Sequence, residues 1–598
     1  MKKSVAVLGG GVGGLTAAHE LVERGFQVTV VDRHHVPGGK ARSFPKPGGT
    51  ATDGRSPLPG EHGFRFFPSF YRHLPDTLRR IPIDGQPDGV AGNLVATTRI
   101  EMARAGDPAI IAPVNFPRSA RDWRSALDGL VDFAHLGIPA GDFLHFVRCL
   151  LLIATSCEER RLGELEDQSW WHLMGASRRS KAFQQFLAVG LTRSLVACRA
   201  TEISTRTGGA ILLQLVFGMA TPGVRVDRVL DGPTNEVWID PWVTYLEGRR
   251  VQYEPHVEVT GIECRDNRIT GVTLLDHGRG VERRLEADYY VAALPVEVMQ
   301  GLIGPPIAAA DPALANLAAL RTSWMNGVQL YLGTDVPLLP GHAVYLDSPW
   351  ALTSVSQQQF WRKDIDRDFG DGRVHGILSI DVSNWDQPGI LYGLPAQHCT
   401  REQMIEEIIA QLQEHLNLTG KPPVLERANI LDWNIDRDIR SHACSGEDGD
   451  HTVDCVNREP LLINTAGSWQ YRPDAVSRIE NLFLASDYVR TYTQLACMEG
   501  ANEAARRAVN GILEQSDSPA APCEVWPLEE PAIFAPFRAL DRLAYAVGAP
   551  NPIDRPLGLL LDAGTAWPAR LAGSLLGPAL FAPLLAGLRA LLSRTVRA

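Results

Sequence analysis

Several patterns are missing from this sequence, and each absence excludes a class of protein. The nine cysteines are scattered and form no C-x-x-C pair, which suits a reducing compartment with mostly buried thiols. There is no basic stripe and the net charge is −11, which argues against nucleic acid as a partner. No segment is an unambiguous membrane span. With 45% hydrophobic and 21% charged residues, the composition is that of a folded soluble protein.

The first residues resemble a secretion signal only superficially. Met1, Lys2 and Lys3 precede an apolar run, but residues 9–14 contain five glycines and interrupt it. We therefore expect no export and a cytoplasmic location. A chain of 598 residues is too long for one hydrophobic core, so two or three domains are expected.

Residues 4–32 have the pattern of a dinucleotide-binding unit. A β-branched run precedes a glycine cluster, apolar residues then recur at helical spacing, and a second apolar run ends in Asp32. The alternative is a structural βαβ unit with a glycine-rich turn. The pattern alone does not distinguish NAD from FAD.

Each part of this unit has a predicted physical role. Gly9 allows the tight turn, Gly11 lets a pyrophosphate approach the backbone, and Gly14 lets the helix pack closely on the strand. The turn as a whole, including Gly13, opens a helix whose free N–H groups face the phosphates. Asp32 follows Gly14 by 18 residues, close to the spacing of about 20 for an acid that binds a ribose hydroxyl.

Two further stretches extend this predicted site. Gly38 and Gly39 are followed by Lys40, Ala41 and Arg42, which indicates backbone close to phosphate or ribose, although a plain turn is the alternative. Residues 64–71 contain five aromatics, which would line a flat cofactor ring or an apolar substrate, or simply pack in a core. His62 and Arg65 are the ionisable groups set among them, and they are the only candidates for catalytic residues.

A second anion-and-sugar site is predicted near the end of the folded region. The apolar run at 481–486 ends in Asp487, and a helix opens at Met498 and continues to about Leu513. Asp487 would accept a hydrogen bond from a polyol hydroxyl, and the N–H groups near Met498 would face the pyrimidine oxygen of a flavin. Two such sites fit one extended FAD better than NAD.

Three other segments allow more than one interpretation. Residues 143–153 form a broad apolar face, which is typical of a buried helix or of a membrane-facing entrance for an apolar substrate. Residues 571–588 are uncharged and flanked by arginines, which favours an interfacial membrane segment, with a helix packed on the body or a partner as the alternative. Residues 436–454 are acidic, and their histidines and cysteines match no zinc spacing, so we expect a solvated loop and no metal.

The predicted fold class is α/β, with a discontinuous Rossmann-type FAD-binding domain. It would comprise residues 1–83, 225–300 and 456–515. Residues 84–224 and 301–455 would form a mixed α+β substrate-binding domain. Residues 516–598 would be a proline-rich linker and an apolar helical tail.

The chain resembles the flavin amine oxidase superfamily. The motifs that carry this resemblance are GGGVGG at 9–14, PGGK at 37–40 and NLFLASDY with MEGA near the end. Within it, YRP at 471–473, ACMEGA at 496–501 and DGPTNEVWIDPW from 231 look like the branch of plant-type phytoene and ζ-carotene desaturases and hydroxysqualene dehydroxylases. The resemblance implies FAD, and implies that further residues contact it: Arg33, Gly63, Phe64, Arg65, Val257 and Cys497. Ser486 stands where the family usually has glycine, and Asn502 and Glu503 replace small residues.

This resemblance leads to a functional hypothesis with alternatives. We expect a FAD-dependent oxidoreductase that transfers hydride from a lipophilic, isoprenoid or carotenoid-like substrate to flavin N5, with quinone or O2 as acceptor and peripheral membrane contact through the tail. An amine or amino-acid oxidase is less favoured, because such enzymes often place a lysine near the flavin and this chain has only seven lysines. A redox-neutral isomerase or dehydroxylase using reduced FAD, and a non-catalytic carrier, are the remaining alternatives.

Overall fold

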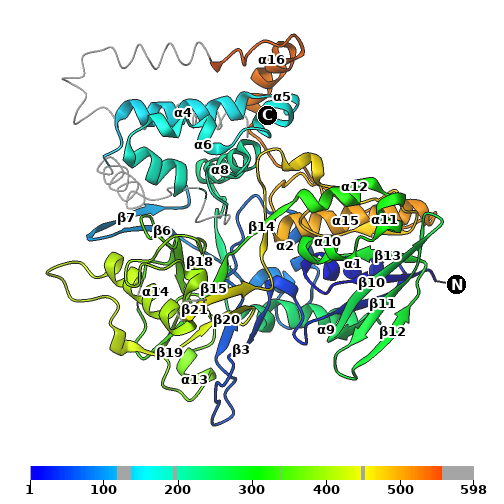
Figure 1. Ribbon diagram of the computed structural model, residues 1–598, viewed down its shortest axis with the longest axis horizontal. Coiled ribbons are helices and arrows are strands. Elements are labelled where there is room, and N and C mark those ends of the chain that lie inside the picture. The colour runs from blue at the N-terminus through cyan, green and yellow to red at the C-terminus, as the bar shows by residue number, and fades with distance from the viewer. Residues whose placement is uncertain are drawn as a thin grey trace.

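The computed structural model describes residues 2–116, 137–190, 192, 198–336, 338–445 and 451–554. The uncharged segment 571–588 lies outside the described residues. Figure 1 shows a parallel sheet with its covering helices, a second sheet beside it, and a group of helices that lies over both.

The parallel sheet is assembled from distant parts of the chain. Its strand order is β23-β13-β1-β2-β9 and all its pairings are parallel. Its strands are β1 (Ser4–Leu8), β2 (Gln27–Asp32), β9 (Gln252–Pro255), β13 (Tyr289–Ala292) and β23 (Leu482–Leu484). Helices α1 (Val12–Glu23) and α15 (Met498–Gln515) pack against each other and on this sheet. The chain therefore has a discontinuous Rossmann-type α/β fold.

Both faces of this sheet are covered, and its strands therefore consist of continuous apolar runs. Val5, Val7, Val28 and Val30 are all fully buried, as expected for a parallel sheet between layers. An antiparallel sheet stands beside it, formed by β10 (Val257–Arg265), β11 (Arg268–Asp276) and β12 (Val281–Leu285). Helices α9 (Asp240–Gly248), α10 (Val296–Leu302), α11 (Pro305–Ala310) and α12 (Pro312–Ala315) complete this part.

The second large sheet has seven strands in the order β19-β15-β18-β17-β16-β6-β7. All of its pairings are antiparallel except that of β16 with β6. The strands are β6 (Arg99–Arg104), β7 (Asp107–Pro113), β15 (Asn326–Leu332), β16 (Gly341–Tyr345), β17 (Leu352–Ser356), β18 (Gly376–Val382) and β19 (Ile430–Ile435). The region 84–122 had no predicted elements, because β6 and β7 lack strong periodicity.

Helix α14 (Arg401–Leu416) covers one face of this sheet. Thr400 accepts from the backbone of Gln403, whose side chain in turn accepts from the Thr400 N–H, which is a complete capping box. Ile405, Ile408 and Leu412 pack in one buried cluster with Leu330 and Ile380 of the sheet.

A third group of elements is helical. It contains α4 (Ala140–Thr155), α5 (Glu158–Arg160), α6 (Trp170–Leu173), α8 (Thr205–Ala220) and α16 (Ala535–Ala546). Figure 1 shows α16 beside α4 and α5. The Arg160 Nε lies 3.0 Å from the buried Asp541 carboxylate of α16, so part of the predicted tail is anchored on the body. Within the described residues, no single helix meets the length and hydropathy of a membrane span, although α4 with the next helical segment passes as a pair bent by 114°.

Short elements connect these parts, and two of them contradict an expectation from the sequence. The described residues of the 436–454 segment do not form a solvated loop, because β20 (Ile439–Ser445) and β21 (His451–Asn457) pair as antiparallel strands and Asp436 and Asp438 are buried. The remaining short elements are β3 (Ser43–Pro45), β4 (Pro59–Glu61), α2 (His73–Arg79), β5 (Leu94–Ala96), β8 (Arg228–Leu230), β14 (Arg321–Ser323), α13 (Ile365–Asp368) and β22 (Leu461–Ile463). The β5–β8 and β14–β22 ladders cross the predicted domain boundaries, which remain a prediction.

Candidate functional site

A cavity of about 560 Å³ lies where the parallel sheet, the seven-stranded sheet and α8 meet. Most residues that the sequence singled out line it. They are Gly9, Gly11, Gly13, Asp32, Arg33, Gly38, Gly39, Lys40, Ala41, His62, Gly63, Phe64, Arg65, Val257, Asp487, Cys497 and Met498. Gly14 and Arg42 do not line the cavity. The fold therefore brings segments from both ends of the chain to one site.

The glycine turn leaves no room for a side chain at Gly13 or Gly14. A Cβ on Gly13 would lie 1.9 Å from the carbonyl oxygen of Ala485, and Gly9 has φ +106°. Gly14 lies behind the turn, where a Cβ would meet the Gly9 carbonyl at 1.8 Å. The N-terminus of α1 has no side-chain cap and no acid in its first turn. Its free N–H groups thus face the cavity and suit a pyrophosphate.

Asp32 ends β2 at the edge of the cavity. Its Oδ2 accepts the Gly10 N–H at 2.6 Å and its Oδ1 accepts the His34 N–H at 2.7 Å. Burial raises the pKa of this carboxyl, and the facing His34 and these two backbone donors work against that rise. Each carboxylate oxygen retains a second lone pair, so Asp32 can also accept from a ribose hydroxyl.

The opposite end of the site is organised by Arg472, the arginine of the YRP motif. Its buried guanidinium donates to the carbonyl oxygens of Asp487, Tyr488, Val489 and Gln494 at 2.6 to 2.9 Å. These bonds fix the loop that follows β23 and so place Asp487 at the cavity. Helix α15 begins directly after Cys497, whose Sγ accepts from the Gly500 N–H.

Two of the three residues that depart from the family pattern, Asn502 and Glu503, support this end of the site. Asn502 donates to Thr16 of α1 at 2.8 Å and to Thr77 of α2 at 3.0 Å. Glu503 accepts the Tyr492 N–H at 2.7 Å. Both are fully buried, so they hold α15 and its preceding loop in place.

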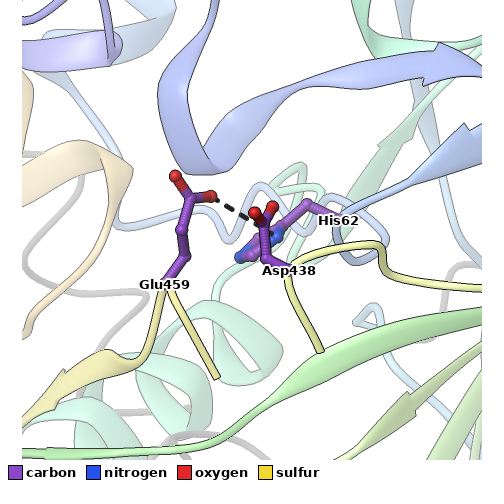
Figure 2. Close-up of side chains that lie close together, drawn as sticks. All are labelled: His62, Asp438 and Glu459. Atoms are coloured by element: carbon purple, nitrogen blue, oxygen red, sulfur yellow. Dashed lines mark ion pairs between the residues drawn. The ribbon is translucent and has the colours of Figure 1, made fainter. Parts of the chain in front are cut away.

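A buried ionic cluster lies beside the cavity. It contains Arg42, which does not line the cavity itself. Its guanidinium pairs with Asp438 and, at 2.7 Å, with Glu459. His62 Nδ1 lies 2.5 Å from Asp436 and 3.9 Å from Glu459. Figure 2 shows His62, Asp438 and Glu459 pointing toward one another. Their spacing would admit a metal ion, but Arg42 already compensates both carboxylates.

Arg65 lies close to carboxyl groups, and only 12% of its side chain is exposed. Its Nη2 donates to the Lys40 carbonyl at 3.0 Å and lies 4.0 Å from Glu61. Burial raises the pKa of Glu61 to about 7, against the opposing effects of Arg65 and of the Thr234 donors. Thr234 belongs to the DGPTNE motif, which therefore holds the β3–β4 hairpin against the site.

Sequence reasoning missed several polar residues of the cavity, among them Asp227, His342 and Asp381. Burial raises the pKa of Asp381 to about 7, and the nearby Arg65 and His62 oppose this rise. A carboxyl within the otherwise apolar strand GILSIDV was a usable signal for Asp381. Asp227 and His342 carry no such signal, since each stands alone in its segment.

A large part of the remaining cavity wall is apolar. Helix α8 contributes one stripe, and the aromatic stretch after His62 contributes its side chains. The apolar lining residues include Ile211, Leu212, Leu215, Val216, Met219, Phe64, Phe66, Phe70, Ile100 and Val344. The cavity is thus polar where the glycine turn meets it and apolar along α8.

These features fit a bound dinucleotide. The uncapped α1 N-terminus, the glycine turn that excludes side chains, and the acids at each end suit pyrophosphate and two sugar chains. The fold and the site together define a nucleotide-cofactor-dependent α/β oxidoreductase with an apolar substrate side.

The chain belongs to the family of flavin containing amine oxidoreductases, whose sequence profile matches residues 12–513. It is 24% identical over 533 residues to a probable ζ-carotene desaturase of Synechococcus elongatus, covering 85% of this chain and 98% of that protein. It is 21% identical to a 15-cis-phytoene desaturase of the same organism, covering 86% and 96%. The fold is similar to that of cyclohexylamine oxidase from Brevibacterium oxydans, with a TM-score of 0.55, 14% identity and coverage of 86% and 100%. This protein is therefore a FAD-dependent oxidoreductase.

Proposed function

We propose that this enzyme desaturates a long lipophilic substrate of the isoprenoid or carotenoid type. The observation that carries the proposal is the apolar wall of α8, which is continuous with the predicted cofactor site in one cavity. A polyprenyl chain has no polar handle, so burial at about 25 cal/mol per Å² would supply most of its binding energy. The two desaturases to which the chain is similar support this substrate class.

The residues of the chain would bind the substrate, orient it and exclude water. The α8 stripe would hold the substrate chain along the cavity. Phe64 and Phe66 would keep water from the reacting bond. When bound, FAD supplies a two-electron acceptor, and Asp32, Asp487 and the α1 N-terminus are the groups predicted to hold it. Quinone or O2 would then reoxidise the cofactor.

Amine oxidation is the second candidate, and one observation favours it. The Asp381 carboxyl lines the cavity and its Oδ1 has no hydrogen-bond partner among the described residues. An ionised carboxylate there would attract an ammonium group. The apolar area of the α8 wall favours the lipophilic substrate instead.

Anaerobic reduction of the bound flavin separates the two candidates. The holoenzyme would be mixed with ζ-carotene or 15-cis-phytoene in liposomes, or with cyclohexylamine, while bleaching of the flavin band is recorded. We expect a polyene to reduce the flavin and cyclohexylamine not to. Reduction by the amine alone would overturn the proposal.

A variant of the α8 wall sharpens this test. Leu215→Asp places a charge in the apolar lining, and we expect it to slow polyene-dependent reduction by about 10-fold or more with unchanged FAD content. Leu391→Asp, at a side chain that is 53% exposed, is the matched control and should behave as wild type.

We also propose peripheral contact with a lipid surface at the helical layer. Phe537, Leu540, Leu543 and Val547 on and directly after α16 are 39 to 79% exposed. The chain beyond residue 562 contains no acid, which favours approach to a membrane surface. A lipid surface at this point would also be a source of lipophilic substrate.

A further inference from the structure

One imidazole in the cavity is held by a carboxylate. His342 lies on β16, and its Nδ1 is 2.7 Å from the Oδ2 of Asp227. The same Oδ2 accepts the hydroxyl of Thr97 at 2.7 Å. Asp227 precedes β8 and Thr97 precedes β6, so three separate segments fix the ring. A carboxylate on Nδ1 selects the tautomer that carries its proton there, which leaves Nε2 as an acceptor.

Two aromatic rings flank the imidazole of His342. The ring of Phe64 lies 5.2 Å from the imidazole and that of Phe66 lies 5.5 Å away at 89°. Only 11% of the His342 side chain is exposed. Its Nε2 is buried and has no hydrogen-bond partner in the described part of the chain. The ring thus presents an unused basic nitrogen at the apolar part of the cavity.

Two charged groups act on this imidazole. Burial lowers the pKa of His342, but Asp227 on one side and Asp381 of β18 on the other raise it above its usual value on balance. A base whose pKa lies near the working pH is the most effective proton acceptor. In the β6–β16 pairing, the residue opposite His342 is the apolar Ile100.

We propose that His342 accepts the substrate proton during oxidation and that Asp227 is its positioning residue. This inference rests on the proposed desaturation. One substrate C–H bond gives up its hydrogen as hydride to the oxidised flavin. The neighbouring C–H bond loses its hydrogen as a proton to Nε2, and its electron pair forms the new C=C bond. The imidazolium charge is then balanced by Asp227, and the two electrons remain on the cofactor until an acceptor removes them.

The candidates predicted from the sequence are less suited to this role. His62 is engaged with Asp436 inside the Arg42 cluster, so its Nδ1 is directed toward a carboxylate and away from the apolar part of the cavity. The Arg65 guanidinium has too high a pKa to accept a proton, although burial lowers that pKa. His342 combines a fixed tautomer with a vacant acceptor nitrogen.

The kinetic test compares His342→Gln, Asp227→Asn and wild type in anaerobic flavin reduction by the polyene that reacts. We expect His342→Gln to slow reduction by about 100-fold or more, the usual range for general bases, with unchanged FAD content. In wild type, the rate of flavin reduction should fall at low pH, where the His342 imidazole is protonated and cannot accept a proton. This decrease should be absent in His342→Gln. In Asp227→Asn, the decrease in rate should occur at a lower pH than in wild type.

The matched control is His398→Gln. His398 makes the same Nδ1 contact with Asp454, also at 2.7 Å, but it lies on the surface with a side chain that is 44% exposed. This variant should keep the wild-type rate and pH profile. A His342→Gln enzyme with wild-type rate and profile would overturn the inference while leaving the proposed function intact.

A second measurement does not depend on turnover or on the folding of His342→Gln. In the holoenzyme labelled with ¹⁵N-histidine, one imidazole should have a pKa above the ordinary value for histidine, and this pKa should fall in Asp227→Asn but not in His398→Gln. An unchanged set of titrations in Asp227→Asn would overturn the inference. If neither polyene reduces the wild-type flavin, the proposed function fails, and the proton acceptor assigned for desaturation fails with it, whatever the titration shows.

Discussion

At the scale of single residues, Gly13 is the position where the fold leaves least space beside the cofactor site. A Cβ would lie 1.9 Å from the Ala485 carbonyl oxygen, a backbone atom that cannot rotate away. Gly13→Ala must therefore separate α1 from the loop after β23. We expect the Kd for FAD to rise about 10- to 100-fold, since a clash in packed structure costs about 1 to 3 kcal/mol.

Equilibrium dialysis of FAD against the apoprotein measures this change. Gly248→Ala, at the end of α9, is the control because a Cβ there has nothing within 4 Å. Equal FAD affinity in both variants would contradict the close packing of the turn.

Asp381 gives a pH-dependent prediction at the same scale. Burial raises the pKa of its carboxyl to about 7 in the folded state, so the folded protein binds a proton there that the unfolded chain releases near pH 4. The stability gained from the neutral carboxyl is complete at low pH and is lost as pH rises toward 7. Asp381→Asn has no carboxyl at this position, so the variant should not lose stability in this way as the pH rises.

Relative to wild type, the free energy of unfolding of Asp381→Asn should therefore rise by about 2 kcal/mol when the pH is raised from about 5.5 to 8. Urea unfolding of the two proteins at both pH values measures the difference. Asp84→Asn changes an exposed acid and should show no such pH dependence. A difference between Asp381→Asn and wild type that stays constant with pH would rule out the raised pKa.

At the scale of elements, α15 links the closing motif to the second helix of the chain. Glu499, in the MEGA motif, accepts the backbone N–H groups of Arg72, His73 and Leu74 at 2.7 to 2.9 Å. Its carboxylate thus caps the N-terminus of α2 from another helix, where a negative charge is favourable. The motif is structural at this residue as well as close to the cofactor site.

We expect Glu499→Ala to lower the free energy of unfolding by about 2 to 4 kcal/mol, because it leaves three buried donors without an acceptor. Thermal unfolding monitored by circular dichroism would record a lower midpoint. Glu514→Ala, an exposed acid near the other end of α15, should leave the midpoint within about a degree of wild type. A small effect for Glu499→Ala would mean that water replaces the carboxylate.

The elements also show which parts of the fold could be predicted. The strand-helix-strand unit within residues 4–32 and the helix that begins at Met498 were predicted from local patterns, and the structure contains both. The strands β6 and β7 were missed because their residues are half-buried and do not alternate clearly. The hairpin β20–β21 was read as a loop because its acids suggested solvent, whereas Asp436 and Asp438 are buried beside His62 and Arg42.

At the scale of the whole molecule, the proposed membrane contact depends on α16. Its buried Asp541 joins it to Arg160 and to the Cys157 N–H, while Leu543 and Val547 are 70 and 79% exposed. The double variant Leu543→Glu with Val547→Glu should bind phosphatidylcholine vesicles at least about 10-fold more weakly than wild type, because each apolar side chain contributes about 1.5 to 3 kcal/mol on burial.

Vesicle co-sedimentation of the full chain measures this binding. Val424→Glu, at a residue that is 43% exposed in another part of the molecule, should bind as wild type does. Unchanged binding of the double variant would show that α16 is not the contact, and absence of wild-type binding would overturn the membrane proposal itself.

The sequence by itself determined the cofactor and the Rossmann-type fold, because turn glycines, helix starts and strand-ending acids act through neighbours within a few residues. It also indicated that Asp32 and Asp487 serve opposite ends of one FAD, and both acids do line one cavity. Only the tertiary structure decided what faces that cavity. Asp227, His342 and Asp381 come from separate segments that no local pattern relates, and their pairing and burial exist only once the sheets and α8 have packed together.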